Sequence, residues 1–250
     1  MDKTLIKGLT LVEALANSEA SRGVSSLAKE LGLSKSNVHR ILLTLQSRDY
    51  VRRLDINSTY ELTAKIWELG FKVRGRLSLL KVSAPHLSKL SSQTGESVHL
   101  SILDGSEVVY IDKIEGTYPI AAYTRVGGRA PAYCVATGKA MLSYVEESKI
   151  KSIIPTLEKF TSATLSSHAA LCEDLAKIRE LGYAVNKGEW REGVFGIAAP
   201  IMELDGKVIG AIGISGPSSR YKARQIKAYA EAVVTAARAI SAEMGYNSSN

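Results

Sequence analysis

The first fifty residues alternate apolar and polar positions with the period of an α-helix. Apolar side chains recur every three or four residues over Thr4–Ala16, which predicts an amphipathic helix. A short second helix follows, with Ser25 as its expected N-cap, and Gly32 separates it from a third helix that Ser34 caps. Helix, glycine-containing turn and helix in this order indicate a helix-turn-helix, whose later helix enters the major groove of DNA.

One face of the third helix, which runs to about Arg48, carries hydrogen-bonding and basic side chains. With the capping serine, its members are Ser34, Lys35, Ser36, Asn37, His39, Arg40 and Thr44. Arginine can bond both acceptors of guanine, asparagine can pair with adenine, and hydroxyls commonly hold phosphate. An ordinary solvated face would have a similar composition, but the helix-turn-helix order favours contact with DNA.

Two short β-prone runs follow the third helix, on either side of a turn at 55–58. Runs separated by Asp, Asn and Ser are typical of a hairpin, and a hairpin directly after a recognition helix is a wing. Arg52 and Arg53 begin this hairpin, so we expect them to contact backbone phosphate or the minor groove.

The next segment predicts a helical linker and the start of a second domain. Apolar positions at helical spacing cover 65–76 and continue into another helix, which Pro85 should kink or restart. These helices are candidates for dimerisation because an exposed apolar stripe favours association. We therefore divide the chain into a DNA-binding domain, 1–64, a linker, 65–76, and a second domain, 77–250.

The second domain has the pattern of an α+β fold. Asp-Gly pairs at Asp104-Gly105 and Asp205-Gly206, between apolar or alternating runs, predict two β-hairpins. A further strand is expected at 119–126, and the helical segments fall at about 136–145, 166–181 and 219–244. Such a domain should have a mainly antiparallel sheet with helices on one face.

The charge of the chain supports a nucleic-acid partner for the first domain. Residues 1–76 hold thirteen Lys and Arg against eight Asp and Glu, whereas the other 174 residues hold nineteen against seventeen. A basic module joined to a nearly neutral one suggests that the first faces DNA. Neither an apolar run of membrane-spanning length nor a signal peptide is present, so we expect no membrane partner and a cytoplasmic location.

Catalytic and metal-binding motifs are missing from the sequence. Cys134 and Cys172 form no CxxC and the histidines do not cluster, so neither a disulfide framework nor a metal site is expected. Gly138-Lys139 lacks the rest of a Walker loop, and GxGxxG, HExxH and GxSxG do not occur. We expect no enzymatic activity, no catalytic residues and no cofactor.

The sequence resembles the IclR family of bacterial transcription regulators over nearly its whole length. GLSKSNVHRILLTLQSRDYV is similar to the family's recognition-helix signature. TGESVHLSILDGSEVVYIDKI, VGGRAPAYCVATGKAML and EGVFGIAAPIMELDGKVIGAIGISGP, with Arg220, are similar to its effector-domain blocks. The resemblance implies a winged helix-turn-helix and a GAF/PAS-like effector domain. It also implies dimers or tetramers, and binding to an operator in double-stranded DNA that a small organic or aromatic acid alters.

The same resemblance implies a position for the effector pocket. Its expected residues are Ala136, Thr137, Asn186, Gly196, Gly213 and Ser215. Family members that bind very small oxo-acids tend to carry an acid where Asn186 stands and larger side chains at the two glycines. This departure suggests a roomier site for a larger ligand, such as an aromatic acid, unless the glycines serve strand packing only.

Two other functions remain open at this point. A constitutive architectural protein would bind DNA and use the second domain only to oligomerise, and an enzyme could carry a DNA-binding tail. A pocket with convergent polar groups would separate the regulator from the first alternative. A nucleophile–base pair in that pocket would favour the second.

Overall fold

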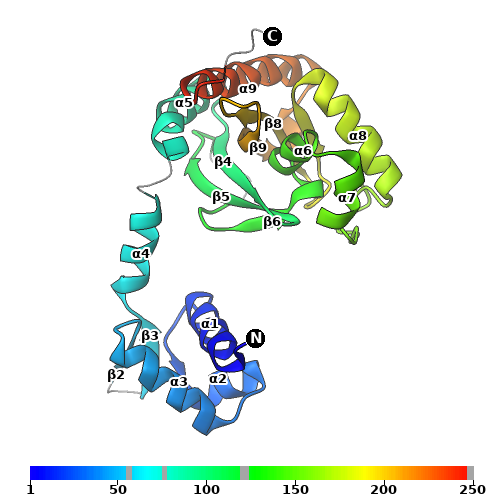
Figure 1. Ribbon diagram of the computed structural model, residues 1–250. Helices are drawn as coiled ribbons and strands as arrows, with labels where there is room; N and C mark the ends of the chain where they lie inside the picture. The colour runs from blue at the N-terminus through cyan, green and yellow to red at the C-terminus, as the bar shows by residue number, and fades with distance from the viewer. Residues whose placement is uncertain (55–57, 75–77, 119–123, 247–250) are drawn as a thin grey trace. The chain divides into compact units, whose positions relative to one another are not determined.

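The computed structural model describes residues 1–54, 58–74, 78–118 and 124–246 (Figure 1). Internal contacts divide the chain into two units, Met1–Leu77 and Ser78–Asn250. Each unit has its own hydrophobic core, so each can be described by itself.

The first unit is a small helical domain with a three-stranded sheet of order β1-β3-β2. Its elements are α1 (Lys3–Ala16), β1 (Arg22–Gly23), α2 (Val24–Leu31), α3 (Lys35–Ser47), β2 (Val51–Leu54), β3 (Thr59–Leu62) and α4 (Ala64–Arg74). The apolar stripes of the first three helices meet in one core, where Leu11, Leu27, Val38, Leu42 and Tyr60 are buried. This arrangement confirms the predicted winged helix-turn-helix.

The helix boundaries in this unit confirm two of the expected signals and correct a third. Gly32 ends α2 in the left-handed conformation with φ 61°, and the Ser34 hydroxyl accepts the N–H of Asn37 at the start of α3. Ser25 is not an N-cap. The helix begins at Val24, two residues earlier than that cap implies, because Gly23 is held in strand β1 beside β3 and α2 starts directly after it.

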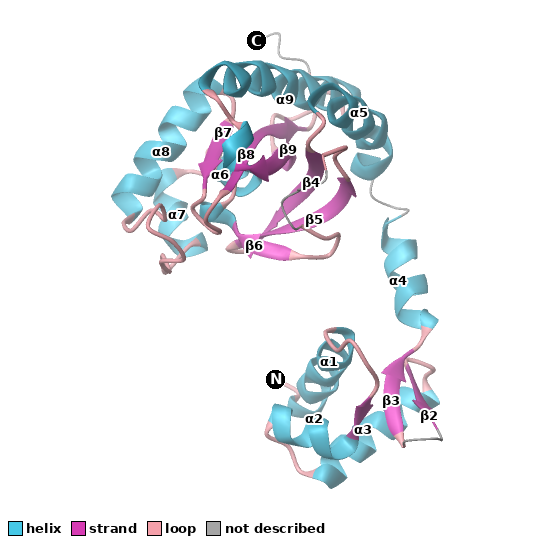
Figure 2. Cartoon of the chain, turned by 180° about the vertical axis from the view of Figure 1, so that it is seen from behind, coloured by secondary structure: helices cyan, strands magenta, loops and turns pink. Residues whose placement is uncertain are grey.

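The second unit contains a six-stranded antiparallel sheet of order β6-β5-β4-β9-β8-β7 (Figure 2). Its strands are β4 (Ser97–Asp104), β5 (Glu107–Ile114), β6 (Arg129–Pro131), β7 (Ala184–Lys187), β8 (Val194–Met202) and β9 (Val208–Pro217). Its helices are α5 (Ser78–Thr94), α6 (Ala136–Leu142), α7 (Glu147–Ile153), α8 (His168–Leu181) and α9 (Ala223–Glu243). Both Asp-Gly hairpins are confirmed, with φ of 60° at Gly105 and 77° at Gly206.

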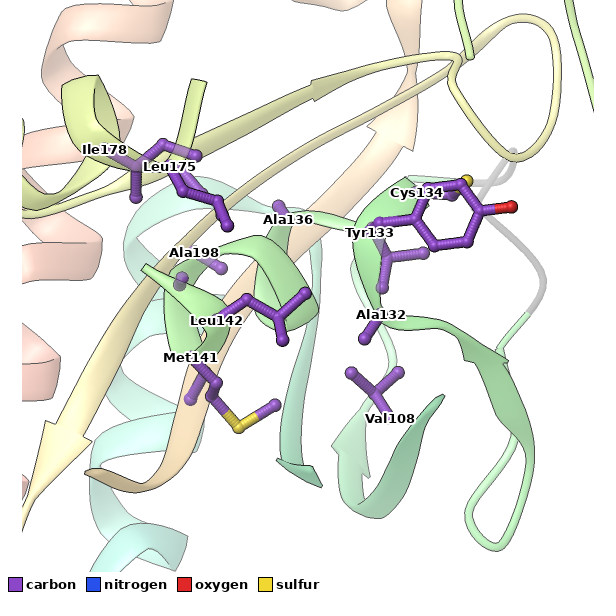
Figure 3. Close-up of a cluster of buried hydrophobic side chains, with 14 of the residues drawn as sticks. Val108, Ala132, Tyr133, Cys134, Ala136, Met141, Leu142, Leu175, Ile178 and Ala198 are labelled. Carbon is purple, nitrogen blue, oxygen red and sulfur yellow. The ribbon is translucent and has the colours of Figure 1, made fainter. Parts of the chain in front are cut away.

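Helices cover both faces of this sheet, so the expectation of one covered face was wrong. The long strand β8 shows why, because successive side chains of a strand point to opposite faces. Ile197 and Ile201 pack in a core with α5 and α9, whereas Ala198 packs in a second core with α6 and α8. Figure 3 shows side chains of the second core, including Leu142 of α6 and Ile178 of α8. Burial of both faces of the sheet explains why the sequences of β8 and β9 are continuous apolar runs.

Three other expectations need correction. Of the two outcomes expected at Pro85, the start of a new helix is wrong, because Pro85 lies inside the single helix α5. Within the expected strand at 119–126, residues 119–123 lie outside the described residues, and Thr124–Val126 are not in a strand. The strand next to β5 is instead the short β6, and helix α7 was not predicted.

Candidate DNA-binding surface and ligand pocket

The residues expected to contact DNA lie together on the exposed side of α3. Ser34, Lys35, Ser36, His39, Arg40 and Thr44 are exposed, and Asn37 is half-buried. The helix contains no carboxylate, and none of the ion pairs in the described ranges involves Lys35 or Arg40. Because the amino end of a helix carries a partial positive charge, this end of α3 attracts a phosphate group.

Two residues on this face differ from the expectation. The Thr44 hydroxyl donates to the backbone oxygen of Arg40 at 3.0 Å, so only its lone pairs remain for an outside partner. Leu43 was assigned no role, yet its side chain is 49% exposed. It follows Arg40 by three positions and Ser36 by seven, so helical spacing could have identified it. An apolar side chain at this position can contact a thymine methyl group.

The two wing arginines do not act as a pair. Adjacent residues of a strand point to opposite faces, so Arg52 and Arg53 project from opposite sides of β2. Arg52 forms an ion pair with Glu61 of β3, with 2.5 Å between Nη2 and Oε1. Arg53 donates to the Ser58 hydroxyl at 2.9 Å. Of the expected wing turn at 55–58, residues 55–57 lie outside the described residues.

A pocket in the second unit encloses about 530 Å³, including its open mouth. Five of the six residues expected from the family resemblance line it: Ala136, Thr137, Asn186, Gly196 and Ser215. They come from α6, β7, β8 and β9, so the fold brings together positions that are far apart in the sequence. The pocket lies on the α6 face of the sheet, since a Cβ at Gly196 would point to Ala136 and Asn186.

Gly213 does not line this pocket, and the extra space expected beside it is absent. A Cβ atom there would lie 2.8 Å from Cβ of Ala198 and 2.9 Å from the backbone oxygen of Ile197. Both distances are too short for a real contact, so close packing between strands and α6 requires glycine at this position. At Gly196 the nearest atom would be 3.3 Å away, which leaves little room as well.

The polar side chains of the pocket fall into two groups. The hydroxyls of Thr137 and Ser215 are buried and have no hydrogen-bond partner in the described structure. Asn186, in contrast, uses its amide internally: Nδ2 donates to the backbone oxygen of Cys134, and Oδ1 accepts the N–H of Gly188 at 3.0 Å. The two hydroxyls are therefore ready to bond a ligand, whereas Asn186 mainly fixes the shape of the wall.

Nine further lining residues were not predicted, and five of them carry polar or aromatic side chains: His99, Tyr110, Thr124, Trp190 and Arg191. The rings of His99 and Tyr110 meet edge to face, 5.5 Å apart. Burial, assisted by the nearby charge of Lys113, lowers the pKa of His99 to about 3, so its imidazole is neutral. Burial likewise raises the pKa of Tyr110 to about 12. These residues lie in separate strands and loops, and no local pattern marks them.

The Gly138-Lys139 pair has a structural explanation. A Cβ at Gly138 would come within 2.1 Å of the Ala132 backbone oxygen, so α6 can approach that segment only with glycine there. The Lys139 side chain is 2% exposed, and its Nζ lies 2.8 Å from Glu189 Oε1 and 3.0 Å from Asp174 Oδ2. Burial raises the pKa of Glu189, and Lys139 opposes that rise. The lysine thus ties α6 to α8 and to the loop after β7.

Two general features complete the description. Over the described residues, no group of three or more His, Cys, Asp or Glu side chains is arranged to hold a metal ion. In the same part of the chain, no helix is both long and apolar enough to cross a membrane.

Known proteins match both units. Residues 4–55 match the IclR helix-turn-helix domain, and residues 71–242 match the bacterial transcriptional regulator IclR C-terminal domain. The HTH-type transcriptional regulator KdgR of Escherichia coli is 34% identical over 98% of this chain and 93% of its own. The transcriptional repressor IclR of the same organism is 31% identical, over 97% and 90%.

Solved structures agree with these relatives. The IclR structure from Thermotoga maritima aligns with a TM-score of 0.81 and 31% identity, covering 97% of this chain and 99% of that one. An IclR homolog from Microbacterium hydrocarbonoxydans, solved with 4-hydroxybenzoate, aligns with a TM-score of 0.84 over 97% and 99%, at 22% identity, and supports the fold. The chain therefore belongs to the IclR family, and it is a DNA-binding transcription regulator of that type.

Proposed function

We propose that a small organic or aromatic acid, bound in the pocket beside α6, alters the binding of this regulator to its operator. The observation that carries the proposal is that Thr137 and Ser215 both line the cavity, and that their buried hydroxyls have no hydrogen-bond partner in the described structure. A buried polar group without a partner costs about 1–3 kcal/mol. A ligand oxygen that accepts from both hydroxyls would remove this cost.

The relative from Microbacterium hydrocarbonoxydans supports the ligand class, because its structure contains 4-hydroxybenzoate. The aromatic lining of this pocket, with Tyr110 and Trp190, suits a flat ligand. We infer no enzymatic role. The pocket brings a hydroxyl and an imidazole together, since Thr124 Oγ1 lies 3.5 Å from His99 Nδ1, but burial lowers the pKa of His99 to about 3 and makes it a poor general base at neutral pH. Incubating a bound acid with the protein should therefore leave the acid chemically unchanged.

We further propose that the protein acts as a homodimer, or a tetramer of two dimers, on a two-fold related operator in the cytoplasm. The first unit exposes apolar side chains on two helices: Leu5 (62%), Leu9 (55%), Trp67 (71%) and Phe71 (60%). A second copy would cover these surfaces and place two recognition helices on paired half-sites. On this proposal 1–64 is the DNA-binding domain, 65–76 the linker and 77–250 the effector domain.

The test is a thermal-shift screen of organic and aromatic acids, followed by operator-binding measurements with each acid that binds. A ligand that binds only the folded protein must raise the melting temperature. Ser215→Ala should weaken binding about tenfold, because one hydrogen bond to a charged acceptor is lost. Ser152→Ala, on exposed α7, is the matched control. If no acid in a broad panel shifts the melting temperature, or if bound acids leave operator affinity unchanged, the proposal is wrong.

A further inference from the structure

A short loop between two glycines forms the outer wall of the pocket. Gly188 and Gly193 adopt left-handed conformations, with φ of 82° and 74°, and between them Trp190 and Arg191 both line the cavity. The Arg191 guanidinium lies over the indole ring of Trp190, 4.4 Å from its centroid. None of the ion pairs in the described ranges involves Arg191, so its charge at the pocket mouth is available to a ligand.

Buried contacts hold this loop in place from the inside. Lys139 Nζ lies 2.8 Å from Oε1 of Glu189, the residue before Trp190. The Thr164 hydroxyl donates to the Glu189 backbone oxygen at 2.6 Å, and the Thr161 hydroxyl donates to Gly188 at 2.8 Å. A loop that is already ordered presents its side chains to a ligand at a low entropic cost. Lys139 is thus a positioning residue for the pocket wall.

The pocket consequently has polar groups in two zones. Thr137 and Ser215, both over 90% buried, offer hydroxyls in its interior, and the exposed Arg191 offers a guanidinium at its mouth. Between them the lining is mostly rings and apolar side chains, including Tyr110 and the neutral His99. This inference rests on the proposed function. We propose that the ligand is a two-ended acid, with oxygen groups at both ends of a flat or short body, and that Arg191 favours its binding over that of a one-ended acid.

We expect a preference for two-ended acids because such a ligand can bond the inner hydroxyls and the Arg191 guanidinium at the same time. A one-ended acid such as benzoate, bound through the inner hydroxyls, has no second oxygen group for Arg191. A two-ended acid gains a second charge-assisted hydrogen bond, the stronger class of such bonds. We therefore expect it to bind at least tenfold more tightly than its one-ended counterpart.

The chain provides its own probe for this comparison. It contains two tryptophans, so Trp67→Phe leaves Trp190 as the single indole, located in the pocket wall. In this background, Trp190 emission can be titrated with benzoate, 4-hydroxybenzoate and terephthalate, and with butyrate and succinate. 4-Hydroxybenzoate and terephthalate should bind more tightly than benzoate, and succinate more tightly than butyrate. Arg191→Met should abolish that preference and leave the affinity for benzoate and butyrate within about twofold, whereas Arg224→Met, an exposed arginine elsewhere, should preserve it.

Three results would overturn the proposal, and they can be told apart. Equal affinity for one-ended and two-ended acids would remove the second zone from recognition. Equal weakening of all acids by Arg191→Met would mean that Arg191 supports the pocket without selecting its ligand. The absence of binding by every acid, in a panel that also shows no thermal shift, would instead reject the proposed function together with this inference.

Discussion

The two units of the molecule use polar side chains in opposite ways. On α3 most functional groups are exposed, and the basic residues Lys35 and Arg40 are outside the ion pairs of the described residues, so solvent screens their charges until DNA binds. In the pocket most polar side chains are buried and neutral: Asn186 is held by internal hydrogen bonds, His99 is kept uncharged by burial, and the Thr137 and Ser215 hydroxyls have no partner in the described structure. Mutations on α3 should therefore affect binding and spare stability, whereas mutations around the pocket should affect both.

The largest expected effect tests the buried side of this contrast. Lys139→Met removes the cation between Glu189 and Asp174, and breaking a buried ion pair from one side typically costs about 3–5 kcal/mol. Urea unfolding of the second unit, followed by Trp190 emission in the Trp67→Phe background, measures the loss. Lys177→Met is the control, because that lysine forms an exposed pair with Glu173 and should contribute little. If the two variants have the same free energy of unfolding, the buried Lys139 does not stabilise the second unit.

The second effect depends on pH. The unfolded chain protonates His99 near its ordinary pKa of 6.5, whereas the folded protein keeps it neutral down to about 3. Stability is therefore full above pH 6.5 and falls with decreasing pH, by about 2 kcal/mol at pH 5. Urea unfolding at pH 7 and pH 5 measures this difference, and His99→Gln should reduce it. If wild type and His99→Gln lose the same stability between the two pH values, His99 is not the cause.

The third effect tests the exposed side. Arg40→Ala should weaken binding to a selected DNA sequence by about 1–3 kcal/mol and relax the preference at one base pair. Its melting temperature should not change, because Arg40 is exposed and outside the core. Fluorescence anisotropy with the selected and random duplexes separates these outcomes. Lys29→Ala, which removes an exposed charge on α2, is the control for simple charge loss. If both variants change the affinities for the selected and random duplexes alike, α3 does not recognise the DNA sequence through Arg40.

The same contrast explains what the sequence could and could not predict. The DNA-binding face is encoded within one helix, so the buried stripe of Val38, Ile41 and Leu42 identifies the residues opposite to it. The pocket walls come from separate strands and one loop, so the hydrophobic pattern gave no sign of His99 or Trp190. The resemblance to the IclR family predicted lining positions that the hydrophobic pattern did not. It could not show that the space beside Gly213 is filled by neighbouring atoms, since that depends on how closely strands and helix approach.

The smallest expected effect concerns the two wing arginines, Arg52 and Arg53. Each phosphate contact contributes about 0.9 to the slope of log K against log salt. The sequence predicts such contacts for both Arg52 and Arg53, but they project from opposite faces of β2, so one DNA backbone can meet only one of them. Glu61 pairs with Arg52 and would repel phosphate, whereas Arg53 is bonded only to the neutral Ser58 hydroxyl among the described side chains.

We therefore expect Arg53→Ala to make the slope less steep by about one and to weaken all DNA sequences alike. Arg52→Ala should leave the slope nearly unchanged, because the lost charge was already balanced by Glu61. Glu61→Gln tests whether the ion pair with Glu61 is what keeps Arg52 from contacting phosphate, since it removes the carboxylate and leaves Arg52 in place. If Arg52→Ala flattens the slope and Arg53→Ala does not, the opposite face of the wing contacts DNA. If neither does, the wing makes no phosphate contact, and the DNA interface is confined to α3 and its amino end.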